Sequence, residues 1–207
     1  MQAYLVRRAG IAANAAELDA ALTRLRTAEH RQAVPGAQWL RSYAVREPDG
    51  RLGLACVFLA DRRDRLLAHA QQVQLAATEV NAIVQRLPGR AFERTHAVLV
   101  RRRACWPAGA ATAVALPERV PRGEAAHGVR RLHSYVVLEA DGTRGTWCLY
   151  AGGDVAAVRG HAAATGWPLD TAVPVLGRIV FRDEPPARPS SGPTRPDPLN
   201  PFAGDHP

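Results

Sequence analysis

The clearest absence in this 207-residue sequence is lysine, since all 27 of its basic residues are arginine. With 19 acidic residues, the formal net charge is +8. A basic balance often indicates nucleic-acid binding. Here the arginines are scattered, and the densest groups, Arg101–Arg103 and Arg130–Arg131, have no interleaved aromatic residues and lie in no helix-turn-helix or zinc-finger pattern. The sequence therefore predicts a solvated basic surface and argues against a nucleic-acid partner.

Cysteine is also scarce, with three residues and no close pair. This number argues against a disulfide framework and against CxxC-type zinc or iron–sulfur sites. No run of 18 apolar residues occurs, which excludes a transmembrane helix. The first residues lack the basic region and apolar stretch of a secretory signal. We therefore expect a cytoplasmic protein with reduced thiols and no membrane partner.

Familiar catalytic motifs are absent too. The sequence has no GxSxG, P-loop, GxGxxG or HExxH pattern. No pair of carboxylates falls at matched positions, so a glycosidase-type dyad has no support. Motifs alone therefore assign no catalytic residue.

Proline is concentrated at one end of the chain. Residues 185–207 hold 8 of the 16 prolines, among serine, threonine, glycine and aspartate. Proline removes backbone donors, so this stretch predicts a disordered tail.

The rest of the sequence contains one pattern twice. Ser42, Cys56 and His69 each recur 92 positions later, as Ser134, Cys148 and His161. Such a constant offset indicates a duplicated unit. We assign residues 1–92 to the first unit and residues 93–184 to the second.

Each unit reads as strand, helix, strand, strand, helix, strand, which is the ferredoxin-like arrangement. In the first unit we expect strands over Ala3–Arg7, Trp39–Val45, Leu52–Leu59 and Val80–Val84, and helices over Ala16–His30 and Leu66–Ala77. In the second we expect strands over His96–Arg101, Arg131–Leu138, Arg144–Tyr150 and Val173–Arg182, and a helix over Asp154–Ala164. The segment Ala104–Gly128 contains three prolines, so a regular helix is not expected there.

The bare face of each sheet needs cover, and the other sheet is the natural partner. The predicted fold class is therefore α+β, with two tandem ferredoxin-like units packed sheet to sheet as a pseudo-dimeric α/β barrel. This arrangement is an intramolecular pseudo-dimer and leaves room for a homodimer. Alternation along the hairpins predicts which side chains face the interior: Arg41, Tyr43, Val45, Cys56 and Phe58 in the first unit, and His133, Tyr135, Val137, Thr146, Cys148 and Tyr150 in the second. Trp147 and Leu149 are expected under the helices.

Several of these residues also resemble a known family. Ser134-Tyr135, Cys148, Tyr150, His161-Ala162 and Gly166-Trp167-Pro168 are similar to positions of small bacterial ferredoxin-like proteins described as nickel-binding. The first unit has the same pattern in Ser42-Tyr43, Cys56 and His69-Ala70. The resemblance implies a dimeric α/β barrel and, in some members, nickel. The sequence departs from the family in its two fused units, its lost helix and the glutamines after His69.

These observations favour a small-ligand or metal-binding protein without catalytic activity, holding nickel or another late first-row divalent metal. The expected metal ligands are His133, Cys148 and His161, and the expected ligand-binding residues are Arg41, Tyr43, Tyr135 and Tyr150. A second hypothesis is a small-molecule enzyme, monooxygenase- or isomerase-like, in which Tyr135, His133 and Arg41 transfer protons in the inter-sheet cavity. A third is an interaction module with an acidic partner. Each histidine and cysteine also has a purely structural interpretation, as a packed core residue.

Overall fold

The structure, a computed structural model, describes residues 1–88, 96–110 and 114–182. The expected tail (185–207) and the expected boundary between the two units lie outside these residues.

The first half of the chain has the predicted order of elements: β1 (Gln2–Ala12), α1 (Ala15–His30), β2 (Ala37–Arg46), β3 (Leu52–Ala60), α2 (Arg63–Gln72) and β4 (Glu79–Pro88). Asn14 begins α1, where its side chain accepts a hydrogen bond from the Glu17 backbone N–H at 3.0 Å. Helix α2 ends before the predicted Ala77, because Gln74 adopts a left-handed φ of 52°.

The second half contains β5 (Ala97–Trp106), α3 (Arg119–Gly123), the 3-10 turn η1 (Ala125–His127), β6 (Arg130–Leu138), β7 (Arg144–Ala151), α4 (Val155–Thr165) and β8 (Thr171–Val180). In the proline-containing segment, the described residues after the end of β5 form only the short elements α3 and η1. Asp154 caps α4 through the Ala157 backbone N–H at 2.8 Å. No helix of the described residues is long and apolar enough to cross a membrane.

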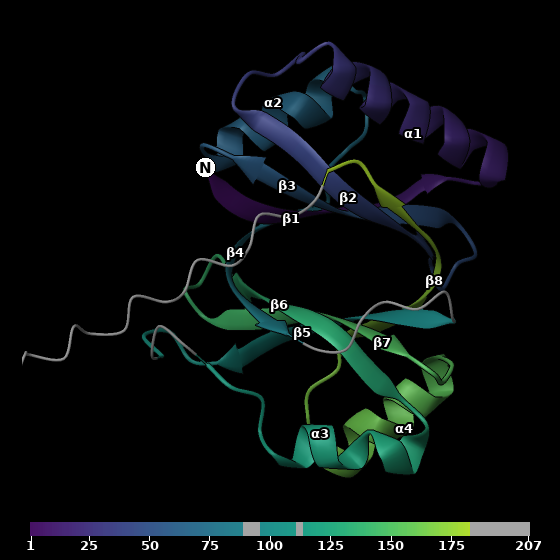
Figure 1. Cartoon of the computed structure of the whole chain (residues 1–207), viewed down its shortest axis with the longest axis vertical. Helices are drawn as coiled ribbons and strands as arrows, with labels where there is room; N and C mark the ends of the chain where they lie inside the picture. Colours follow the sequence, from purple (N-terminus) through teal and green to yellow (C-terminus); the bar gives the residue numbers. More distant parts are fainter. Residues whose placement is uncertain (89–95, 111–113, 183–207) are drawn as a thin grey trace, which may run out of the picture.

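The eight strands form one closed antiparallel barrel in the order β1-β3-β2-β8-β5-β7-β6-β4. Each half contributes four neighbouring strands in the ferredoxin-like order, and the β2–β8 and β4–β6 pairs join the halves. Helices α1 and α2 cover one side of the barrel, and α3 and α4 cover the opposite side (Figure 1). The predicted fold class is therefore confirmed, and closure leaves neither sheet with an unpaired edge.

Buried apolar residues form three layers. One cluster lies between the first sheet and α1 and α2, around Trp39, Leu54 and Phe58. A second fills the barrel, around Tyr43, Tyr135 and residues such as Val57 and Leu149. A third and smaller cluster lies under α4. Strands β2, β3, β6 and β7 are thus buried on both faces.

The prediction of side-chain direction was correct for β2 and β6 and wrong for β3 and β7. Tyr135 pairs with Trp147, and Ser134 pairs with Cys148, so Trp147 and Leu149 face the interior. Thr146, Cys148 and Tyr150 point toward the helices instead. In the first half, Ser42 pairs with Cys56, which places Cys56 and Phe58 under α1 and α2. The pairing register across each hairpin decides which side chains of β3 and β7 face the barrel interior. Both faces of these strands are buried, so the alternation of apolar and polar residues does not reveal that register.

Candidate functional site at one end of the barrel

One end of the barrel brings together polar residues from four strands. Strands β2 and β6 run in the same direction, because four antiparallel pairings separate them around the barrel. Arg41 lies in the first half of β2 and His133 in the first half of β6. The antiparallel neighbours β4 and β8 end there, and bring Arg86 and Arg178 to the same end.

The centre of this site is a contact between the two halves of the chain. The Tyr43 hydroxyl lies 3.0 Å from His133 Nε2, with both side chains buried. The His133 ring also meets the ring of Tyr135 edge to face, with centroids 5.2 Å apart. Arg41 and Tyr135 are close enough to the Tyr43 hydroxyl to act on its pKa, which both of them lower. Tyr43 and Tyr135 occupy equivalent positions in the two halves, so the site lies where the halves meet.

The surroundings keep His133 uncharged. Burial, together with the positive charges of Arg86, Arg41, Arg178 and Arg131, lowers the pKa of His133 to about 3, and burial is the largest cause. Burial raises the pKa of Tyr43, although Arg41 and Arg178 act against that change. At neutral pH the pair therefore consists of a neutral imidazole and a neutral phenol.

This end of the barrel carries a concentration of positive charge. Arg41 is 6% exposed, whereas Arg86 and Arg178 are exposed. Arg131 lies 4.0 Å from the Glu124 carboxylate, which offsets part of the charge. Because guanidinium groups form paired hydrogen bonds with carboxylates and phosphates, such an arrangement favours a negatively charged ligand.

Three of the expected ligand-binding residues, Arg41, Tyr43 and Tyr135, lie together at this end, with His133 beside them. The fourth, Tyr150, does not. It packs on the helix side, where its hydroxyl is 3.4 Å from Arg102 Nη2 and its ring lies 5.8 Å from the His161 ring.

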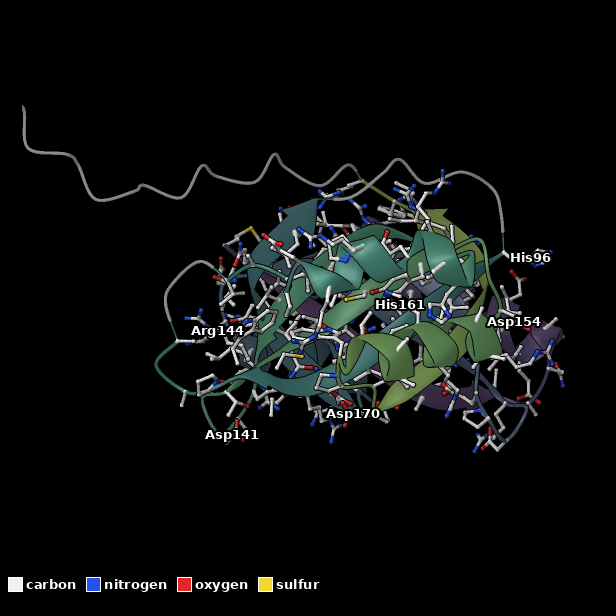
Figure 2. All side chains as sticks on the ribbon, turned by 90° about the horizontal axis from the view of Figure 1, so that it is seen from below. His96, Asp141, Arg144, Asp154, His161 and Asp170 are labelled. Carbon is white, nitrogen blue, oxygen red and sulfur yellow. The ribbon has the colours of Figure 1, made fainter. Side chains whose placement is uncertain are left out.

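The expected metal ligands do not meet. His133 faces the barrel, whereas Cys148 and His161 lie on the other side of the sheet. Cys148 accepts a hydrogen bond from Ser134 at 2.8 Å, and His161 Nε2 lies 2.9 Å from the Val120 carbonyl of α3. Figure 2 views the molecule from the side of α3 and α4, where His161 is labelled. Among the described residues, no group of three histidine, cysteine or acidic side chains could hold a metal ion. The residues present do not fit the nickel that the resemblance implied.

No sequence pattern singles out Arg86 and Arg178. Each stands alone among scattered arginines, and only the pairing of β4 with β6 and of β8 with β2 brings them to His133 and Tyr43. Arg101 and Arg102 were also misinterpreted as part of a solvated surface. They are 2% and 0% exposed, respectively, and only Arg103 of that group is open to solvent.

Comparison with known proteins yields a fold likeness. No protein-family model and no curated protein matches the sequence. A proposed monooxygenase from Lactobacillus acidophilus is 11% identical, with 87% of this chain and 100% of that chain covered and a TM-score of 0.43. A proposed chlorite dismutase is 13% identical, with 86% of this chain and 96% of that chain covered and a TM-score of 0.40. A dye-decolorizing protein from V. cholerae is 9% identical, with 86% of this chain and 92% of that chain covered and a TM-score of 0.42.

These findings correct the expected function. The expected metal ligands lie on two faces of the sheet, and among the described residues no group of three such side chains could hold a metal ion. The main sequence-based hypothesis, a metal-binding protein without catalytic activity, is therefore wrong. The matching structures are named as a monooxygenase, a chlorite dismutase and a dye-decolorizing protein, and none of these three is named as nickel-binding. The family resemblance holds only for the α+β barrel.

Proposed function

We propose that the protein is an acid–base enzyme that moves a proton on a small, negatively charged organic molecule at the Arg41–His133 end of the barrel. The observation that carries this proposal is the 3.0 Å contact between the Tyr43 hydroxyl and His133 Nε2, buried beside arginines. Of the two enzyme types expected from the sequence, this pair favours the isomerase-like one.

The contact between Tyr43 and His133 supplies a path for the proton. When Tyr43 Oη accepts a proton from the substrate, its own proton can pass to His133 Nε2 along the existing contact. The imidazole then holds the proton and returns it through Tyr43 to another substrate atom. The result is a proton shift within the substrate, with no net change in the enzyme.

The charge of the substrate controls whether His133 can hold a proton. An imidazolium at His133 is disfavoured in the free protein, because its pKa is about 3 in the field of the arginines. An anion bound to those arginines would offset their field and raise the pKa of His133 toward the working range of a general base. The substrate charge would thus activate the pair, whereas an uncharged analogue would bind without activating it.

The test is hydrogen exchange in D2O. We would incubate the protein with 2-oxo and 3-oxo carboxylates, and with their methyl esters, and follow deuterium incorporation by NMR. We expect exchange in a carboxylate, at least about 10-fold slower exchange in its ester, and a loss of about 100-fold or more in His133→Gln and Tyr43→Phe. His96→Gln, which changes an exposed histidine, is the control. Exchange that is unaffected by His133→Gln, or carboxylate binding without exchange in the wild type, would contradict the proposal.

A further inference from the structure

A second polar site lies in the first half of the chain, on the helix side of the sheet. Arg8 of β1 is fully buried, and its Nη1 donates to the Leu75 carbonyl. Its Nε and Nη2 have no hydrogen-bond partner. His69 of α2 is 4% exposed, and neither of its ring nitrogens has a partner. The Arg8 charge lowers the pKa of His69, and the Cys56 thiol is close enough to Arg8 to influence the pKa of the guanidinium.

The unpartnered N–H donors of Arg8 need a hydrogen-bond acceptor. A buried guanidinium without a counter-charge is strongly unfavourable, and each unsatisfied buried N–H adds to that free energy. Within the described residues, Arg8 forms no ion pair with a carboxylate. Burial raises the pKa of Cys56, so the neighbouring thiol is protonated at neutral pH and supplies no negative charge.

At the equivalent position in the second half, the chain itself meets part of this need, while Arg102 Nε and Nη1 have no hydrogen-bond partner. There, Arg102 Nη2 lies 3.4 Å from the Tyr150 hydroxyl, and its guanidinium lies over the Tyr150 ring. His161 Nε2 contacts the Val120 carbonyl at 2.9 Å. The first half has Phe58 where the second has Tyr150, and it leaves the ring nitrogens of His69 without a partner.

The free edge of Arg8 also has a defined shape. Nε and Nη2 are the two adjacent donors on one side of a guanidinium, and they match the two oxygens of a carboxylate. In Arg102 this edge is interrupted, because Nη2 is already directed at Tyr150. A groove of about 420 Å³ is lined by Leu75, whose carbonyl contacts Arg8, and by Ala70, which follows His69, but not by Arg8 or His69 themselves.

From this we infer that the Arg8–His69 cluster, between β1 and α2, binds a small carboxylate such as formate or bicarbonate. The carboxylate oxygens accept from Arg8 Nε and Nη2, and a ring N–H of His69 donates to the same anion. The site is distinct from the Tyr43–His133 pair, which lies on the other face of the sheet. Full burial of Arg8 restricts the ligand to a few non-hydrogen atoms.

The experiment is a thermal-unfolding titration of the full chain with sodium formate and sodium bicarbonate, against sodium chloride at equal ionic strength. We expect a saturable rise in Tm with the two carboxylates beyond that in chloride. Phe58→Tyr should lower the apparent affinity at least about tenfold, because the new hydroxyl can occupy Arg8 Nη2 as Tyr150 occupies Arg102. Arg102→Met is the matched control and should leave the titration unchanged.

Phe58→Tyr adds only one hydroxyl, and Arg8→Met is an uncharged variant with a side chain of similar length. The titration can therefore be done on the second variant if the first fails to fold. Equal effects of formate and chloride on the wild type would overturn the inference. An undiminished response in both Phe58→Tyr and Arg8→Met would also overturn it. So would a crystal structure grown in formate with only water at Arg8 Nε and Nη2. None of these outcomes depends on the exchange activity at Tyr43 and His133.

Discussion

The Tyr43 hydroxyl and His133 Nε2 lie 3.0 Å apart, although 90 residues separate them in the chain. Tyr43 belongs to β2 and His133 to β6, which start at the same end of the barrel on opposite sides. The contact therefore exists only when both halves of the barrel are assembled. It joins a titratable side chain from each half at a place where both side chains are buried.

Tyr43→Phe should lower the free energy of unfolding by about 1–3 kcal/mol, because it leaves His133 Nε2 buried without its partner. Chemical denaturation at neutral pH measures this change. Tyr4→Phe is the control, since Tyr4 is a buried tyrosine of β1 outside the site, and its effect should be smaller. Equal losses in both variants would show that the hydroxyl contact contributes nothing specific.

Acid should destabilise the protein through two histidines. In the folded state the pKa of His133 is about 3, and that of His69 is about 4, both lowered mainly by burial. The unfolded chain titrates both near pH 6.5. Between pH 6.5 and 4 the unfolded state thus binds more protons, so the free energy of unfolding falls as the pH falls, by up to about 1.4 kcal/mol per pH unit for each histidine.

Urea unfolding in carboxylate-free buffer from pH 7 to pH 4 would measure that slope. His133→Gln should reduce it, because glutamine does not titrate, and His30→Gln, at an exposed position, should not. A slope that is identical in the wild type and His133→Gln would contradict the burial of a neutral imidazole at this position.

The order of elements could be predicted from the sequence because it depends on local signals and on the repeat of Ser42, Cys56 and His69. Only some residues of the candidate site could be predicted from the sequence. Alternation placed Tyr43, Tyr135 and His133 correctly, but β7 is buried on both faces and offers no clear alternation. Tyr150 and Cys148 were therefore assigned to the wrong side. The contribution of Arg86 and Arg178 depends on strand pairing between the halves, which no local pattern encodes.

Buried ion pairs occupy the opposite end of the barrel, and one of them should matter for stability. Arg7 Nη2 lies 2.5 Å from Glu47 Oε1, with side-chain exposures of 6% and 10%. Arg7 also donates to the Arg8 and Leu54 carbonyls. Glu47→Gln removes the counter-charge of a buried guanidinium and should lower the free energy of unfolding by about 3 kcal/mol.

The matched control for that variant is Glu118→Gln. Glu118 pairs with Arg122 at 2.7 Å, but both side chains are largely exposed, so the change should stay within about 0.5 kcal/mol. Guanidinium chloride screens ion pairs, and urea is therefore the denaturant to use. If both variants lose the same small amount, the Arg7–Glu47 pair is solvated rather than buried.

Two glycines at this end leave space for the acidic side chains. A Cβ at Gly53 would overlap Glu47 Oε1 and lie 2.7 Å from the Arg8 carbonyl oxygen. A Cβ at Gly145 would overlap Glu139 Oε1 and lie 2.5 Å from the Arg102 carbonyl oxygen. Since a backbone carbonyl within a strand cannot move away easily, Gly53→Ala and Gly145→Ala should each lower the free energy of unfolding by about 1–3 kcal/mol.

Gly177 of β8 is the control for both glycine variants, because a Cβ there meets nothing within 4 Å. Gly177→Ala should be neutral, or stabilising by up to about 1 kcal/mol through the lower entropy of the unfolded chain. Chemical denaturation of the three variants gives the comparison. A loss in Gly177→Ala as large as in Gly53→Ala would mean that strand glycines respond alike. In that case close contact with the ion pairs would not be the reason for glycine at positions 53 and 145.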